Sequence, residues 1–181
     1  MKKRLLCFTM LLTVTISAIT FTNNVKAATK WNTNKSVTKE ENGIKYSAYL
    51  TEDGKESWIY QIKLSKKITK LTLPKEINQA KLTRVGFGKE LYNKGEDEDA
   101  YQNLFGDTIE PWHNCYGDLS NDDKNKQTIE TVAIPGTVNQ LEIATFSGMK
   151  KLKSVVIPEQ TASVPAYTFA KCSALSKVTF S

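Results

Sequence analysis

The 181-residue sequence predicts an α/β solenoid, a short array of 23-residue coils with an N-terminal β-hairpin cap and a long insertion after the first coil. Two consecutive stretches near the C-terminus carry apolar residues at a constant spacing of 23. Each contains one short run that alternates as a strand does, and a longer alternating segment precedes the array. Periods of roughly 20 to 30 residues with one short strand each are typical of solenoids, in which every coil covers the apolar edge of its neighbour.

The repeat is read from "QTIETVAIPGTVNQLEIATFSGMKKL" and "KLKSVVIPEQTASVPAYTFAKCSALSKVTF". No helical or coiled-coil period produces this spacing. A third copy begins at the C-terminal strand. The equivalent positions are Val132, Val155 and Val178; Ile134, Ile157 and Phe180; Pro135 and Pro158; Phe146 and Phe169; Met149 and Cys172; Leu152 and Leu175.

Each coil is predicted to contain one strand, one corner and one short helical turn. In "TVAIP", Val132 and Ile134 point to one side and Pro135 ends the strand. In "TFSGMKKL" an aromatic, a soft apolar residue and a leucine follow at i, i+3 and i+6. That spacing favours a helical or 3₁₀ turn on the opposite wall.

Residues 43–67 are predicted to form the capping hairpin. Apolar residues alternate from Ile44 to Leu50 and again from Trp58 to Leu64, and Asp53-Gly54 supplies the turn between them. Its apolar face would cover the first edge of the array. With the repeats, the hairpin makes up one predicted domain, residues 43–181.

Residues 68–88 are predicted to be the first coil, with Leu71 and Leu73 as the inward strand pair. This coil departs from the repeat by two extra residues before Val85. Leu73 and Ile134 are 61 positions apart, 38 more than one period, so residues 89–128 are expected to be an irregular insertion. Residues 129–181 are then the regular coils. Loops as long as this insertion are usually functional or disordered.

Residues 1–27 are predicted to be a signal peptide, so that the mature chain begins near Ala28. A basic start at residues 2–4 precedes an uncharged apolar run from Leu5 to Phe21 and a Val-Lys-Ala exit at residues 25–27. A membrane-spanning helix is the alternative, but the many Thr and Ser residues and the small exit residues favour cleavage. Residues 28–42 are a polar lead-in that need not be ordered.

Removal of the signal peptide lowers the net positive charge of the chain. It takes away four of 25 basic residues and none of 19 acidic ones, so the net charge falls from +6 to about +2. No nucleic-acid partner is therefore expected. Because the signal peptide holds the apolar run, no membrane span is expected after its removal.

The stretch "LKSVVIPEQTASVPAYTFAKCSALSKVTF" resembles the leucine-rich repeat of the BspA type, with the pattern LxxVxIPxxVxxIxxxxFxxCxxLxxV. The resemblance is specific from Ile129 to Phe180. It implies a leucine-rich repeat array in a secreted or cell-surface bacterial protein. It also implies a non-catalytic, adhesion-like module without a cofactor, whose partner is a host protein or a protein on a neighbouring cell.

An enzymatic alternative starts from His113, the only histidine, beside Cys115. Cysteine and histidine can act as nucleophile and base, but catalysis also needs an orienting group and an oxyanion site. Residues two apart rarely present that geometry, so no catalytic residue is predicted. An exported Cys/His hydrolase stays the less favoured alternative. Whether Cys115 pairs with Cys172 stays open.

No metal site is predicted. Two acidic clusters, residues 96–99 and Asp118 with Asp122 and Asp123, fit no calcium loop with its glycine and bidentate glutamate, and solvated charge is the favoured interpretation. One histidine and two distant cysteines cannot complete a zinc site.

The candidate partner-binding residues are the outward strand positions and two aromatic residues of the insertion. Solenoids commonly bind partners on such rows, although small and β-branched residues also pair well across strands without any binding role. The residues are Lys70, Thr72, Thr131, Ala133, Ser154, Val156, Lys177, Thr179, Trp112 and Tyr116.

The last predicted strand leaves Val178 and Phe180 without a covering coil. An uncovered strand is a template for another chain, so self-association through this C-terminal edge strand is expected unless further coils complete it. A truncated fragment of a longer surface protein, without independent function, is therefore a further alternative.

Overall fold

The computed structural model describes residues 29–88, 91, 101–102, 108–109 and 125–181. The predictions for residues 1–27, His113, Cys115, both acidic clusters, Trp112 and Tyr116 concern residues outside this described part. The described elements are β1 (Trp31–Glu41), β2 (Ile44–Thr51), β3 (Glu56–Leu64), β4 (Lys70–Thr72), β5 (Glu76–Ile77), β6 (Ala80–Val85), β7 (Tyr101–Gln102), β8 (Thr108–Ile109), η2 (Lys126–Thr128), β9 (Thr131–Ala133), β10 (Gln140–Leu141), β11 (Ser154–Ile157) and β12 (Lys177–Phe180).

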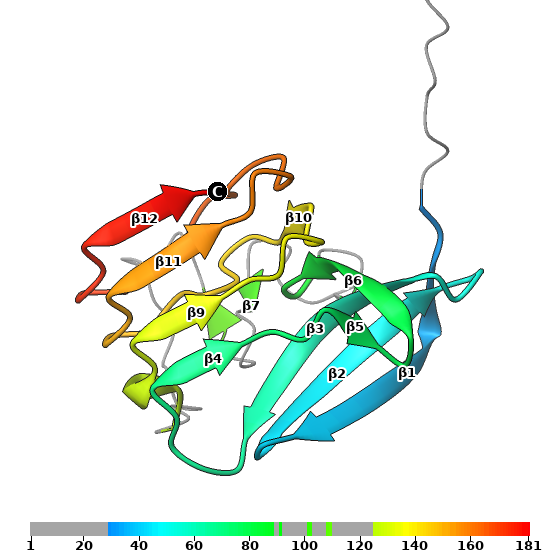
Figure 1. Ribbon diagram of the computed structural model, residues 1–181, viewed down its shortest axis with the longest axis horizontal. Helices are drawn as coiled ribbons and strands as arrows, with labels where there is room; N and C mark the ends of the chain where they lie inside the picture. Colours follow the sequence, from blue (N-terminus) through cyan, green and yellow to red (C-terminus); the bar gives the residue numbers. More distant parts are fainter. Residues whose placement is uncertain (1–28, 89–90, 92–100, 103–107, 110–124) are drawn as a thin grey trace, which may run out of the picture.

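Four parallel strands, in the order β12-β11-β9-β4, form one sheet that we call the repeat sheet. In Figure 1 these strands lie side by side in successive steps. Val155 is opposite both Val132 and Val178, so neighbouring strands keep the predicted register of 23 residues. Leu71 of the first coil is opposite Val132, as its predicted place in the array requires.

Hydrogen bonds between coils repeat the same period. The Lys150 amide donates to the Gln127 side chain, and the Thr161 hydroxyl donates to the Val138 carbonyl. The Ser173 hydroxyl donates to the Lys150 carbonyl in the same way. The first of these bonds begins at Gln127, two residues before the predicted start of the regular coils. Residues next to the strands thus hold the coils in register as well.

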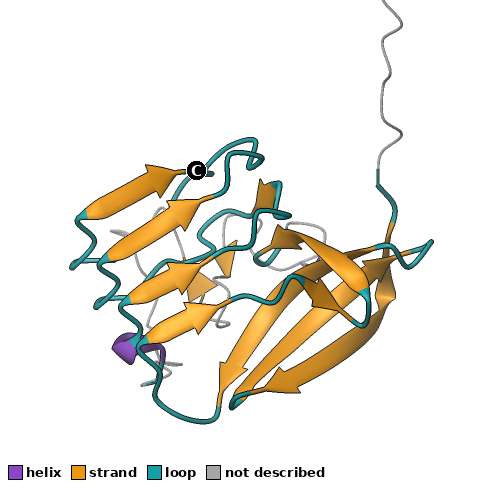
Figure 2. Cartoon of the chain, in the orientation of Figure 1, coloured by secondary structure: helices purple, strands orange, loops and turns teal. Residues whose placement is uncertain are grey.

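The helical part of the predicted α/β solenoid is not found in the described residues, which contain strands, turns and 3₁₀ structure but no α-helix. The purple segment in Figure 2 is the 3₁₀ helix η2. In this part of the chain, no helix has the length and apolar character needed to cross a bilayer. The wall opposite the repeat sheet is a series of single turns, each closed by a hydrogen bond from residue i to i−3, as in Ser147 to Ala144 and Ala170 to Tyr167.

Left-handed residues explain why these turns do not join into a helix. Ala144 and Tyr167, one period apart, have φ of 60° and 58°. Gly148 and Lys171, also one period apart, have φ of 77° and 56°. A right-handed helix cannot continue through such a residue. The spacing of Phe146, Met149 and Leu152 fits a helical turn. Spacing alone does not show which residues between them have positive φ.

The second sheet, which we call the N-terminal sheet, has the order β1-β2-β3-β6-β10, with β5 beside β6. β2 and β3 pair antiparallel around the Asp53-Gly54 turn, where the alternation predicts a hairpin. β3 then pairs parallel with β6, and β6 with β10. The hairpin is therefore continuous with the first two coils through main-chain hydrogen bonds.

Residues 28–42 are predicted to be a polar lead-in without required order, but most of this segment is ordered. Trp31–Glu41 forms β1 and pairs with β2 over most of its length. Most of its side chains are exposed, and only Trp31, Val37 and Lys39 are half-buried. Main-chain pairing with β2 holds this strand, so its sequence needs no apolar alternation.

The first coil departs from the repeat more than predicted. Leu71 and Val85 are 14 positions apart, whereas their partners Val132 and Leu141 are nine apart. The added residues form the tight hairpin of β5 and β6, whose turn places Asn78 and Gln79 at φ of 50° and 68°. The insertion is also not wholly irregular, since β7 and β8 pair antiparallel within it.

The core lies between the two sheets and the turn wall. It combines the inward residues of the hairpin with those of the coils, among them Tyr46, Leu71, Val132, Phe146 and Val155. Packing becomes looser toward the last coil: Val155 and Ile157 are buried, whereas Val178 and Phe180, at equivalent positions, are 40% and 66% exposed.

Candidate binding surfaces

The outer face of the repeat sheet brings together the eight strand residues predicted to bind a partner. The register places Lys70, Thr131, Ser154 and Lys177 in one row and Thr72, Ala133, Val156 and Thr179 in the next. Inward neighbours such as Leu71 and Val155 are buried, while the two rows are half-buried or exposed. Trp112 and Tyr116 lie outside the described residues.

Val156 is the apolar centre of this face. Its side chain is 44% exposed, although β11 is an inner strand of the sheet. Ala133 and Thr179 flank it in the same row. Lysines stand at both ends of the neighbouring row, at Lys70 and Lys177. An apolar centre with a polar rim is the usual arrangement of a protein interface.

An ion pair beside this face links two coils. Lys153 Nζ lies 2.8 Å from Glu130 Oε2, one period away. The hydrogen bond and the charge of Lys153 lower the pKa of the Glu130 carboxyl. Both side chains are exposed, so the pair adds little stability.

The edge strand β4 faces a groove of about 380 Å³ between the repeat sheet and the β1–β2 turn. At its floor the Tyr46 hydroxyl donates to the Thr72 carbonyl at 3.2 Å. Burial, and then the negative charge of Glu41, raise the pKa of Tyr46 to about 12, so this hydroxyl stays protonated. Sequence reasoning did not find the groove, because it depends on the placement of β2 beside β4.

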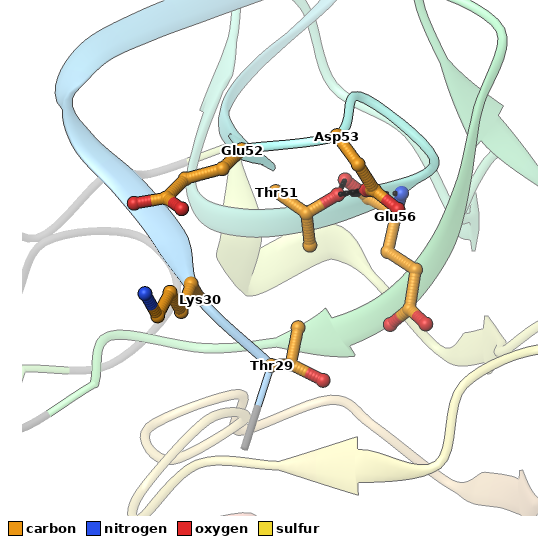
Figure 3. Close-up of a pocket in the computed structure, with 6 residues that line it drawn as sticks. All are labelled: Thr29, Lys30, Thr51, Glu52, Asp53 and Glu56. Carbon is orange, nitrogen blue, oxygen red and sulfur yellow. Dashed lines mark hydrogen bonds between the residues drawn. The ribbon is translucent and has the colours of Figure 1, made fainter. Parts of the chain in front are cut away.

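A second hollow, about 290 Å³ and shown in Figure 3, lies at the β2–β3 turn. Asp53 accepts hydrogen bonds from the Thr51 hydroxyl at 2.6 Å and the Lys55 amide at 3.1 Å, and these bonds lower its pKa to about 2. The Glu56 carboxylate accepts a hydrogen bond from Thr83. Asp53 therefore organises the turn, and Glu56 links β3 to β6.

Among the described residues, no group of three or more His, Cys, Asp or Glu side chains could hold a metal ion. Cys172 is a buried free thiol whose Sγ donates to the Phe146 carbonyl at 3.1 Å. Burial raises the pKa of this thiol to about 11, so it is protonated at neutral pH and is a poor nucleophile. Its place beside Phe146 is that of a packing residue.

A buried charged cluster joins four strands of the N-terminal sheet. Arg84 Nε lies 2.7 Å from Glu142 Oε1, with side-chain exposures of only 5% and 13%. The Arg84 guanidinium lies 3.7 Å from the centre of the Trp58 ring and 5.9 Å from that of Trp31. Gln140 also donates to Glu142, at 2.8 Å. A tryptophan at position 31, within a polar segment, was the one sequence signal for this cluster.

Comparison with known proteins agrees with the periodicity. Residues 124–181 match the family model described as "BspA type Leucine rich repeat region (6 copies)". Neither a curated protein nor a solved structure matches the chain. Repeats of this type are typical of bacterial surface proteins and of protein–protein interaction modules, and they are generally non-catalytic. The resemblance predicted from Ile129 to Phe180 is therefore confirmed, and residues 124–181 are a BspA-type leucine-rich repeat region.

Proposed function

We propose that this protein is an exported surface module that binds another protein through the outer face of its repeat sheet. The signal-peptide pattern of residues 1–27 supports export, and the repeat region supports a role in protein interaction. The partner class that follows from the resemblance is a host protein or a protein on a neighbouring cell. The module works without a cofactor and without catalysis.

The observation that carries this proposal is the exposure of Val156 within two in-register rows of side chains. Residues on an inner strand cannot move independently, because each is fixed by neighbours on both sides. A partner therefore meets a preorganised face, and little conformational entropy is lost on binding. Parallel rows of side chains on an inner sheet face are where repeat proteins commonly bind.

A charge placed at the centre of the face tests the proposal. In the mature protein, Val156→Glu introduces a carboxylate that binding would have to desolvate. The matched control is Thr38→Glu on β1, an exposed position in the other sheet. Binding is measured against a panel of purified extracellular proteins immobilised singly on a sensor surface, with thermal melting of each variant as a check on folding.

We expect at least one member of the panel to bind the wild-type protein, with affinity about tenfold or more weaker for Val156→Glu and unchanged for Thr38→Glu. Equal binding by wild type and Val156→Glu would place the interface elsewhere. Cys115→Ala addresses the hydrolase alternative, because that variant would abolish an activity that depends on the thiol.

We also propose that β12 associates with a second copy of the chain. Val178 and Phe180 are far more exposed than their counterparts in the preceding coil. An edge strand with exposed apolar side chains readily pairs with another strand.

A further inference from the structure

The groove beside β4 has the main-chain groups needed to bind an extended peptide. The Thr131 amide donates to the Thr69 carbonyl, and the Leu73 amide donates to the Ala133 carbonyl. In a parallel ladder, alternate residues of one strand bond to the same neighbour. Thr69, Leu71 and Leu73 thus bond to β9, and the main-chain groups of Lys70 and Thr72 point away from it, toward the groove. The Thr72 carbonyl already accepts a hydrogen bond from the Tyr46 hydroxyl, so the Lys70 amide and carbonyl and the Thr72 amide are the groups left for a bound strand.

The groove combines an apolar floor with a charged rim. Ile44, Tyr46 and Leu73 are buried below it, and Ile68 is half-buried beside them. The lining residues are Glu41, Asn42, Ile44, Tyr46, Lys66, Ile68, Lys70, Thr72, Leu73 and Pro74.

The rim carries an excess of positive charge. Glu41 is already paired with Lys39, whose Nζ lies 3.0 Å from its carboxylate. Lys66 and Lys70 are exposed, and neither forms an ion pair with any residue in the described part of the chain. A bound segment with carboxylates near these two lysines would therefore complement the groove.

We propose that this groove binds an extended peptide segment with alternating acidic and apolar residues, which adds as a strand to the free edge of β4. Strand addition supplies main-chain hydrogen bonds to Lys70 and Thr72, and alternate side chains supply specificity. One set of side chains would lie beside Lys66 and Lys70. The other set would point to the floor formed by Ile44 and Leu73.

A second copy of this chain fits the groove less well. The strand with an exposed outer edge at the far side of the repeat sheet is β12, which continues the row of Lys70, Thr131 and Ser154 with Lys177. Addition of β12 to β4 in the repeat register would therefore place Lys177 beside Lys70. Like charges directly opposite in a sheet are destabilising.

The groove differs from the outer face of the sheet, although Lys70 and Thr72 border both. Binding at the groove uses an edge, and binding at the face uses side chains of inner strands. Val156→Glu should therefore leave binding in the groove unchanged, so that either proposal can fail while the other holds.

Fluorescence anisotropy with short labelled peptides tests the proposal on the mature protein. The probe is a hexapeptide of alternating Glu and Val, and the control probes are the alternating Lys and Val hexapeptide and an N-methylated form of the Glu and Val peptide. The double variant Lys66→Glu/Lys70→Glu reverses the rim charge. Its matched control is Lys35→Glu/Lys63→Glu, which changes two exposed lysines of the N-terminal sheet by the same total charge.

We expect the Glu and Val peptide to bind wild type and the control variant alike, and to lose about tenfold or more in affinity with the rim variant. The N-methylated and Lys-containing probes should bind at least tenfold more weakly, because they lack the main-chain donors or the matching charge. Undiminished binding of the N-methylated probe, or equal binding to both double variants, would overturn the proposal. So would a change of oligomeric state in the rim variant alone, which would make a second copy the occupant.

Discussion

Phe146 and Phe169 occupy the same position in successive repeats but should contribute differently to the free energy of unfolding. Their rings stack with centres 5.9 Å apart, but Phe146 is fully buried and Phe169 is only half-buried. Phe146→Ala should therefore lower the free energy of unfolding by about 3–5 kcal/mol, and Phe169→Ala by roughly half of that. Chemical denaturation of the two variants against wild type measures both values.

Because neighbouring coils stabilise one another, either loss should also loosen the adjacent coil. Equal costs for the two substitutions would mean that the last coil is as well covered as the preceding one. The spacing of 23 assigns both phenylalanines to the core. It does not encode how well each is covered, because coverage depends on the segments packed against the last coil.

At the scale of elements, the positive φ of Tyr167 in the turn wall should cost stability, which substitution can measure. Tyr167 has φ of 58° and a side chain that is 43% exposed, so its ring contributes little packing. A non-glycine residue in this region pays a steric cost of about 1 kcal/mol that glycine avoids. Tyr167→Gly should therefore be about 0.5–1 kcal/mol more stable than Tyr167→Ala, in which the ring is also removed.

Thermal or chemical unfolding of both variants decides the point, and an alanine variant at least as stable as the glycine variant would contradict the left-handed turn. The sequence predicts the strands of this coil better than its turns. Val132 and Val155 mark strands by alternation, whereas Phe146, Met149 and Leu152 have a spacing that fits both a helix and linked turns.

β1 illustrates a second limit of pattern reading. An edge strand with both faces largely exposed has no apolar alternation, so the segment around Lys35 and Thr38 reads as polar and irregular. Its charges also protect the free edge of β1 from pairing with other chains. Trp31 is the exception. It packs edge-to-face on Trp58, with ring centres 5.7 Å apart, and anchors one end of the strand.

At the scale of the whole molecule, the two sheets share one core. Only part of this arrangement could be predicted from the sequence. The hairpin and the coils each follow from local patterns, and so does the idea that one covers the other. The parallel pairing of β3 with β6 and of β6 with β10 does not. It depends on long-range contacts such as the Arg84–Glu142 ion pair, 58 positions apart, which no period indicates. The same holds for the groove beside β4.

The two edges of the repeat sheet differ in a way that bears on assembly. The Lys177 amide donates to the Lys153 carbonyl and the Ser181 amide to that of Ile157, so the main-chain groups of Val178 and Phe180 point away from β11. Their side chains are exposed as well. Within the described part of the chain, no strand pairs with the outer edge of β12, which therefore presents hydrogen-bonding groups and apolar surface together. The edge of β4, by contrast, lies beside a charged groove.

We accordingly expect a protein of residues 28–181, with no further coil after β12, to form dimers or larger species, measured by light scattering over a range of concentrations. Pairing of β12 with its copy about a two-fold axis would satisfy both edges at once and bury Phe180. Thr179→Glu/Phe180→Glu should shift the protein toward monomer, because like charges would face each other across the axis. The control, Thr33→Glu/Thr38→Glu on β1, adds the same charge to an edge that is already polar and should leave assembly unchanged. A monomer at all concentrations, with the amides of Val178 and Phe180 protected from hydrogen exchange, would show that another segment of the chain covers β12.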